Sequence, residues 1–227
     1  MNVKRALVRG LALAIMASMV VLPLSAEAAK SVRVTTGPES RLTYQGTKGD
    51  TTIEGGVTIE YDDVVITSSS ATVNIDAGTA LLSGGVTLVQ GEVTVTAEVM
   101  NIYLKEDRAE FSGGVRLTKI EPQAEMDEEG NPVTTTITLD CSTLKISTAT
   151  QDFDADGDVT VSKGGQVARC RTASYSSSER RIVLEGDVSI TGEDNESIRC
   201  DRATVYTDRE RVEAEGKSME ITFEIED

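Results

Sequence analysis

Histidine and tryptophan are absent from the 227-residue chain, and aromatic residues make up only 4% of it. Without histidine, the chain lacks the side chain that most often serves as a general base or metal ligand near neutral pH. With so few aromatic rings, it also lacks a platform on which sugars or nucleobases could stack. No carboxylate pair stands out from the background of Asp and Glu. We therefore predict a protein that is not an enzyme and has no cofactor; a β-helical lyase or hydrolase is the enzymatic alternative.

Basic residues are also scarce. The 22 Lys and Arg are outnumbered by 38 Asp and Glu, which leaves a formal net charge of −16. A surface of this sign repels nucleic acids and anionic membrane surfaces, whereas mutual repulsion between copies favours solubility. We therefore expect no nucleic-acid partner.

A short pattern centred on glycine recurs along the chain, and Ala80–Leu88 (ALLSGGVTL) is a clear copy of it. Recurrence at a fixed interval is the signature of a repeat architecture. The one long interval matches an acidic insertion at residues 120–134, which contains Pro122 and Pro132 and which we expect to form an enlarged loop. Outside the insertion the unit is 29 or 30 residues long. The successive intervals, with the long one third, are 29, 29, 44, 29 and 30 residues between the central glycines: Gly55, Gly84, Gly113, Gly157, Gly186 and Gly216.

Apolar residues alternate with polar ones inside each unit, which is the period of a β-strand and not of a helix. In the second half of each unit the alternation slips. After Ala97, for example, the apolar set resumes at Met100, so that two residues intervene where one is expected. An offset of this kind is typical of a bulge or corner that redirects a strand without ending it.

These marks predict an all-β fold of about six stacked hairpins, each creased at its middle into a V. The central glycine would face inward at the vertex, where a side chain would not fit. Stacking gives an elongated open β-jellyroll, or β-taco, with an apolar groove between its two arms. The candidate groove residues are the aliphatic and aromatic residues around the glycines: Ile53, Val57, Ile59, Leu82, Val86, Leu88, Phe111, Val115, Leu117, Val159, Val161, Leu184, Val188 and Ile190.

The repeated motif resembles that of the OstA-like family, which includes the lipopolysaccharide-export protein LptA and related domains of LptC and LptD. The resemblance is carried by segments such as AEFSGGVRL (Ala109–Leu117) and IVLEGDVSI (Ile182–Ile190), and by the TAE, RCR and RCDRA segments that follow some copies. It extends from about Leu42 to Ser218. The resemblance implies a periplasmic protein that shields the acyl chains of lipopolysaccharide (lipid A) in its groove and bridges the inner and outer membranes.

The resemblance also implies partners, namely other OstA-like domains of LptC-like and LptD-like proteins, and a possible head-to-tail homo-oligomer. Two other functions stay open at this point. One is an LptC-like membrane-anchored adaptor, and the other is a structural β-stack or scaffold that binds no lipid.

Residues 1–28 are typical of a cleaved export signal. Lys4, Arg5 and Arg9 precede an apolar run, and Ala26–Ala28 forms an A-x-A cleavage site. We expect cleavage after Ala28 and a single OstA-like domain over residues 29–227. The formal charge then becomes −18, because three basic residues and one acidic residue are removed. Retention of the segment as an anchor is the alternative, although the run is short for a membrane span and contains a proline.

Cys141, Cys170 and Cys200 occupy equivalent places in successive units, where earlier units have Ser68 and Ala97. Each unit contributes two strands, so like positions lie roughly 9.6 Å apart, whereas a disulfide needs Cα atoms within about 7 Å. We therefore predict three free, buried thiols.

Metal binding is not expected. The three cysteines are unpaired in sequence and no histidine accompanies them, which argues against zinc. The stretch Asp152–Asp158 resembles the start of a calcium loop, but its twelfth position is Lys163, where such a loop requires a bidentate Glu. We predict a strand there.

An open stack exposes a strand edge at each end, and unpaired edges favour strand addition. We expect the edge contacts at Val32 and Val34 near the N-terminus and at Ile221, Phe223 and Ile225 near the C-terminus. Glu220, Glu224 and Glu226 could instead keep the edges apart.

Overall fold

The structure is a computed structural model that describes residues 32–46, 49–61, 63–126, 132–192, 196–207, 209 and 211–222. The predicted export signal with its cleavage site, and the edge residues Phe223 and Ile225, lie outside the described residues.

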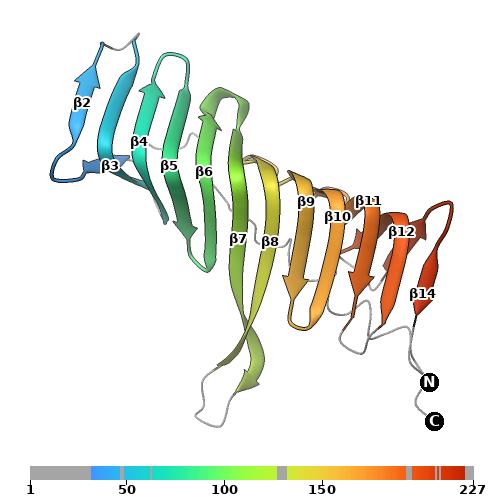
Figure 1. The fold of residues 1–227 in the computed structure, drawn as a ribbon. Coiled ribbons are helices and arrows are strands. Elements are labelled where there is room, and N and C mark those ends of the chain that lie inside the picture. Colours follow the sequence, from blue (N-terminus) through green and yellow to red (C-terminus); the bar gives the residue numbers. More distant parts are fainter. Residues whose placement is uncertain are drawn as a thin grey trace.

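Most of the described residues belong to one 14-stranded sheet, in which neighbouring strands are antiparallel and β3 to β12 follow one another in chain order (Figure 1). The elements are β1 (Arg33–Thr36), β2 (Arg41–Tyr44), β3 (Thr51–Tyr61), β4 (Val64–Asn74), β5 (Thr79–Gln90), β6 (Val93–Tyr103), the short 3₁₀ turn η2 (Leu104–Glu106), β7 (Arg108–Met126), β8 (Pro132–Ser147), β9 (Phe153–Lys163), β10 (Gln166–Ser176), β11 (Arg181–Thr191), β12 (Ser197–Tyr206), β13 (Arg211–Glu215) and β14 (Glu220–Thr222).

The described strands form five complete hairpins, from β3–β4 to β11–β12, and a split strand completes the sheet at each end. β1 and β2 pair with opposite halves of β3, and β14 and β13 do the same with β12. The repeats predicted from the glycine spacing are therefore confirmed, as is the open all-β architecture.

Every long strand is interrupted at its middle. The β5–β6 register shifts between Ser83 and Val86, and the β6–β7 register shifts between Thr96 and Val99. Because these shifts fall at the same level in neighbouring strands, they crease the whole sheet along one line. We name the two halves by their strands. Wall A is made of β2, β13, the first halves of the odd-numbered strands from β3 to β11, and the second halves of the even-numbered strands from β4 to β12. Wall B is made of β1, β14 and the remaining halves of those long strands.

The crease folds the sheet over its own apolar face. Leu82 in wall A and Leu88 in wall B are both fully buried, and they belong to one continuous hydrophobic core. Among the described residues no helix covers that face, so the side chains of each wall are buried by those of the other. The expected alternation is present on both walls, with inward residues buried and outward ones exposed.

The glycines at the crease do not face inward as we expected. Gly113 is exposed, has a φ of +86°, and turns toward the outer surface. A Cβ atom on it would lie 2.5 Å from the Cβ of Glu98 on the neighbouring strand. Gly84 stands in the same relation to Ser69, whose hydroxyl donates a hydrogen bond to the Gly84 carbonyl at 2.5 Å. Close approach between the outer sides of neighbouring strands, not crowding of the interior, requires glycine here.

The residue after the crease glycine also has a positive φ. It is Gly114 in one repeat (φ +75°) but Asp158 (φ +51°) and Asp187 (φ +52°) in others. Around Gly114 no atom lies within 4 Å of an added Cβ. The second position therefore requires the left-handed conformation, which Asp adopts at modest cost, but does not require the absence of a side chain.

The acidic insertion differs from the expected loop. Its described residues, 120–126 and 132–134, prolong β7 and β8 into a two-stranded ribbon that projects beyond the ends of the neighbouring strands (Figure 1). Pro122 pairs with Thr134 in this ribbon. The ribbon extends past the end of β6, so β7 has no neighbour on its other side there, and a residue without an N–H group is tolerated.

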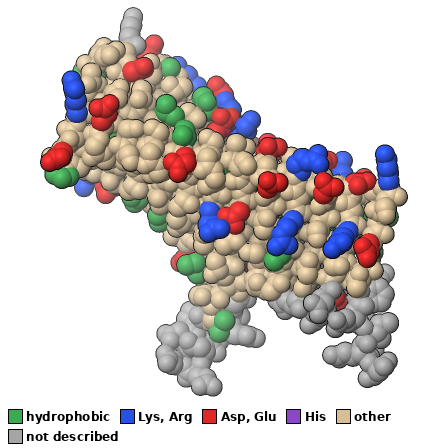
Figure 2. All heavy atoms as spheres, viewed as in Figure 1, with side chains coloured by type: hydrophobic (Ala, Val, Ile, Leu, Met, Phe, Trp, Pro, Cys, Tyr) green, Lys and Arg blue, Asp and Glu red, His purple; other side chains and the backbone are tan. Residues whose placement is uncertain are grey.

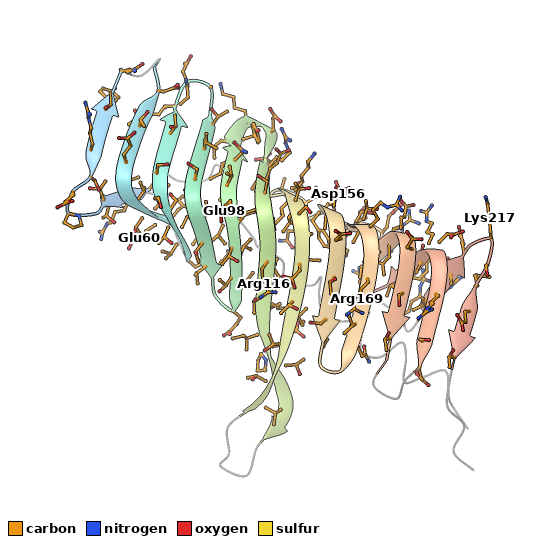
Figure 3. The ribbon with its side chains drawn as sticks, in the orientation of Figure 1. Glu60, Glu98, Arg116, Asp156, Arg169 and Lys217 are labelled. Carbon is orange, nitrogen blue, oxygen red and sulfur yellow. The ribbon has the colours of Figure 1, made fainter. Side chains whose placement is uncertain are left out.

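The outer surface is polar. The face drawn in Figure 2 is dominated by uncharged polar side chains and backbone, with acidic and basic side chains scattered among them. The side chains labelled in Figure 3 come from strands along the length of the sheet, and from the loop before β14, and are all exposed: Glu60, Glu98, Arg116, Asp156, Arg169 and Lys217.

We expect Gly113→Ala to lower the free energy of unfolding by about 2–4 kcal/mol, because the new methyl group combines left-handed strain with contact against Glu98. Urea denaturation monitored by circular dichroism would measure this change.

Gly114→Asp is the matched control, since Asp158 and Asp187 occupy the equivalent position. It should cost no more than about 1–2 kcal/mol. Equal losses for the two variants would contradict the assignment of the contact to the first glycine alone.

Candidate functional site

The predicted groove residues all point into the space between the two walls. Thirteen of the fourteen are at most 5% exposed, and Ile59 is partly buried against the same core. They come from both walls: Leu82 and Phe111, for example, lie in wall A, and Val86 and Val115 lie in wall B. The walls are in contact, so the structure has a filled interior where we expected an open channel.

The even-numbered strands contribute as much to this interior as the odd-numbered strands do. All the groove residues predicted from the sequence lie on odd-numbered strands. Their alternation has the same period, but the slip at the crease hides its continuity in the sequence. The missed residues are equally buried: Val64, Ile66, Val93, Val95, Met100, Ile137, Leu139, Leu144, Ile146, Ala168, Ala173 and Val205.

The interior is almost entirely aliphatic. Phe111 and Phe153 supply its two large rings, and the Phe153 ring stacks on Tyr175 with centroids 5.8 Å apart. The strand pairings of the described residues all join wall A to wall A or wall B to wall B. The walls are thus tied to each other by the chain at the crease and by apolar side-chain contact.

The open hollows in the surface have a different character. Two of them lie side by side at the crease, with volumes of about 490 Å³ and 240 Å³, and both include Asp158. Ion pairs flank them: Arg116 Nε donates to Asp140 at 2.6 Å, and Arg171 lies 3.1 Å from Asp187. Hollows flanked by charged side chains do not suit a hydrocarbon chain, so the buried interior is the candidate site for an apolar ligand.

The three cysteines are free and buried, as predicted. Burial, with smaller contributions from Asp140 and Asp156, raises the pKa of the Cys141 thiol to about 12. Burial also raises the pKa of the Cys170 thiol to about 11, against a hydrogen bond from the Glu185 backbone, and raises the pKa of Cys200. Thiols held protonated in this way are core residues and not nucleophiles or metal ligands.

Both ends of the sheet expose apolar side chains on the inward face. Val32 and Val34 are 57% and 46% exposed at the N-terminal end, and Ile221 is 61% exposed at the C-terminal end. Leu42 and Tyr44 on β2 are similarly exposed. These are the inward positions of a repeat that has no neighbour to cover it.

The outward positions of the same end strands differ in charge. The N-terminal end carries Arg33 on β1 and Arg41 on β2, which are both exposed. The C-terminal end carries Glu215 on β13 and Glu220 on β14, which are exposed as well. The outward charges of the N-terminal strands are thus basic, and those of the C-terminal strands are mainly acidic, with Arg211 on β13 as the exception.

The part of the chain that the structure describes offers neither a metal site nor a membrane-spanning helix. No cluster of three or more Cys, Asp or Glu side chains is arranged to hold a metal ion, and the stretch around Asp154 is the strand β9, with its aspartates exposed. No helix in this part of the chain has the length and apolar character needed to cross a membrane.

The chain matches a known protein family in sequence. The model of a family described as LptA/(LptD N-terminal domain) LPS transport protein matches residues 65–211, more than half of the chain. None of the curated proteins compared with the chain matches it. Among solved structures, the chain is similar to LptH, the LptA homologous periplasmic component of the lipopolysaccharide transport device of Pseudomonas aeruginosa, with 15% identity, 71% of this chain and 95% of that chain covered, and a TM-score of 0.31.

We expect the folded protein to resist thiol reagents. At pH 8, thiols with a pKa of about 11 and 12 should react at least roughly 100-fold more slowly than in the urea-unfolded chain, where the pKa is near 9. The rate of Ellman's reagent measures this, and rapid release of three equivalents from the folded protein would contradict it.

The same pKa changes make stability depend on pH. Because the thiols ionise more readily in the unfolded chain, their protonated form stabilises the folded state. This contribution to the free energy of unfolding is complete below about pH 9 and is lost as the pH rises toward 11 and 12. The double variant C141A/C170A should therefore lose less stability than the wild type between pH 8 and pH 11 in urea titrations.

Proposed function

Since the chain belongs to the LptA/LptD N-terminal domain family of lipopolysaccharide transport proteins, we propose that it is a periplasmic carrier that holds the acyl chains of lipopolysaccharide between its two walls. The observation that carries this proposal is the aliphatic interior, which runs without a break from β3 to β12. Ten strands at about 4.8 Å each give it a length of nearly 50 Å. The period-two pattern, which any β-sheet would show, does not by itself require such continuity.

The closed interior means that the walls must separate to admit a lipid. The strand ladders run within each wall, so separation leaves the backbone hydrogen bonds of the described strands intact. What is lost is apolar contact, at roughly 1.5–3 kcal/mol for each fully exposed Leu, Val or Phe side chain. An acyl chain replaces that contact with contact of the same kind, whereas water does not. The trough is therefore closed without lipid and opens around the crease when lipid enters.

The cleaved signal expected for residues 1–28 supports a periplasmic location, as does the description of the similar LptH as a periplasmic component. The flow of lipid would need an energy source in a partner, since the interior of the described sheet is apolar and has no group suited to bind or hydrolyse a nucleotide. An LptC-like anchored adaptor is the variant of this proposal in which the N-terminal segment is retained.

The closed interior itself favours a second candidate, a structural β-stack whose core stays dry. Such a scaffold would share the end contacts proposed below but would exclude lipid. A measurement inside the core separates the two functions.

We expect an acyl chain to reach the side chain at position 111. The chain contains no Trp, so F111W has a single tryptophan that can be excited selectively, located where Phe111 is 1% exposed. Lipopolysaccharide or lipid A with brominated acyl chains should quench its fluorescence by at least half, because bromine quenches only on contact.

L81W is the control, because Leu81 is 42% exposed on the outer side of the same wall. Its fluorescence should change little. Equal quenching of the two variants would indicate adsorption to the surface, and no quenching of F111W in a folded protein would support the dry scaffold.

We further propose that the ends of the sheet join head to tail, with another copy or with an LptC-like or LptD-like domain. β13 of one sheet would continue wall A by pairing with β2 of the next, and β14 would continue wall B by pairing with β1. The strand registers then place Glu215 opposite Arg41, and they place Glu220 opposite Thr35, which makes Glu220 a diagonal neighbour of Arg33. The inward rows bring Ile221 against Val34.

Charge reversal tests this pairing. R33E/R41E should weaken self-association about tenfold or more in sedimentation equilibrium, because each junction then sets like charges directly opposite one another at position 41 and diagonally at position 33. E215R/E220R should do the same alone. Mixing the two variants should restore association between unlike partners only. A monomeric wild type at high concentration would restrict the junction to other partners, and charge variants that associate like the wild type would contradict the proposed register.

A further inference from the structure

The inward face of wall B carries polar residues among the aliphatic ones at the end of the wall that is farthest from the crease. The strand registers join one inward-facing row across six strands: Gln90, Val93, Lys119, Ile137, Lys163 and Gln166. We refer to this row as the rim. Two lysines thus face inward from β7 and β9, two strands apart, at the mouth of the trough.

Both lysines bind the same carboxylate. Lys119 Nζ lies 2.6 Å from Glu121 Oε1, and Lys163 Nζ lies 3.2 Å from Glu121 Oε2. All three side chains are largely withdrawn from solvent, with 11%, 17% and 21% exposed for Lys119, Lys163 and Glu121. The group holds two positive charges against one negative charge in a chain that is strongly acidic overall.

A neighbouring acceptor has no partner. Gln166 stands opposite Lys163 in the strand register and is 8% exposed, and its Oε1 accepts no hydrogen bond from the described part of the chain. A buried carbonyl oxygen left without a donor is costly, and it suits a ligand that brings a hydroxyl group. The rim therefore combines two ammonium donors, which suit an anion, with one free acceptor.

We propose that the rim is a phosphate-monoester site, in which a phosphate group displaces the carboxylate of Glu121 between Lys119 and Lys163 and an adjacent hydroxyl donates to Gln166. This inference rests on the proposed function when the phosphate belongs to an amphiphile whose acyl chain enters the trough. A phosphate carries more charge than one carboxylate and offers more acceptor oxygens, so it balances the two lysines better.

Glu121 lies in the part of β7 that belongs to the insertion, at the base of the projecting ribbon. In this arrangement the carboxylate occupies the site when no phosphate is present and keeps two buried cations paired. A ligand must exchange with it. The ribbon thus supplies a built-in competitor that favours amphiphiles with a phosphate over uncharged ones.

The test compares three probes by isothermal titration: dodecyl phosphate below its micelle concentration, dodecyl maltoside as an uncharged amphiphile with the same chain, and inorganic phosphate. E121Q removes the competing charge and should tighten dodecyl phosphate binding about threefold to tenfold. K119M/K163M should weaken it at least tenfold. Neither change should alter dodecyl maltoside binding by more than twofold. K145M is the control, because Lys145 pairs with Glu110 at 3.9 Å on the outer face.

The outcomes separate the two proposals. Equal binding of both amphiphiles, unaffected by E121Q, would overturn the rim site and leave the carrier function standing. If neither amphiphile binds, the carrier function fails, and inorganic phosphate decides the site: tighter binding to E121Q supports a site for free phosphate, and no binding to either protein overturns it. If K119M/K163M does not fold, E121Q and K163R, which keeps the charge, decide the result.

Discussion

The structure depends on one constraint: a single sheet has to bury its own apolar face. Nothing else in the described chain covers the aliphatic side of the 14 strands, so that side can leave water only if the sheet folds over. Folding requires every strand to bend at the same level, because a straight strand between two bent ones would break both ladders. The repeat length and the position of the crease glycines follow from this requirement. Each glycine also makes room for the outer side chain of the strand before it, as Gly113 does for Glu98.

This arrangement separates what is rigid from what can open. Within each wall, continuous ladders resist distortion, and the crease is fastened from outside by contacts such as the bond from Ser40 Oγ to the Gly55 carbonyl, at 3.0 Å. Between the walls, the contact is apolar and non-directional. Contact of that kind can be exchanged for lipid without loss of a hydrogen bond, and for water only at a large cost. A closed interior in the absence of lipid is therefore compatible with a carrier.

The architecture could be predicted from the sequence because repetition reinforced each weak signal. One such glycine indicates little, but six of them, at intervals of 29 or 30 residues except across the insertion, together with slips such as that after Ala97, leave few alternatives to stacked creased hairpins. The direction in which the glycines face could not be predicted, because alternation places residue 113 inward with Phe111 and Val115. The bulge puts two residues where a regular strand has one, and the extra residue turns the glycine outward.

Other features of the site were beyond the sequence for different reasons. Whether the walls touch is a matter of distance, which periodicity does not report. The insertion carries two prolines and many acidic residues, which normally indicate a loop. Yet its described residues prolong the sheet, because a ribbon that extends past its neighbours has free edges where Pro122 is tolerated. The polar rim was hidden because Lys119 and Lys163, at the ends of apolar runs, resemble ordinary strand ends.

The split strands at the two ends link the crease to assembly. In the interior, one bent strand crosses from wall to wall, but β1 and β2 are separated by residues 37–40, and β13 and β14 by residues 216–219. Each end strand can therefore follow its own wall when the walls move apart. A junction that pairs wall A with wall A and wall B with wall B then holds at any opening angle, provided that both sheets open together. A lipid that separates the walls of one sheet would bias the adjoining walls of the next toward separation. In an assembly of this kind, the end contacts would transmit opening as well as provide adhesion.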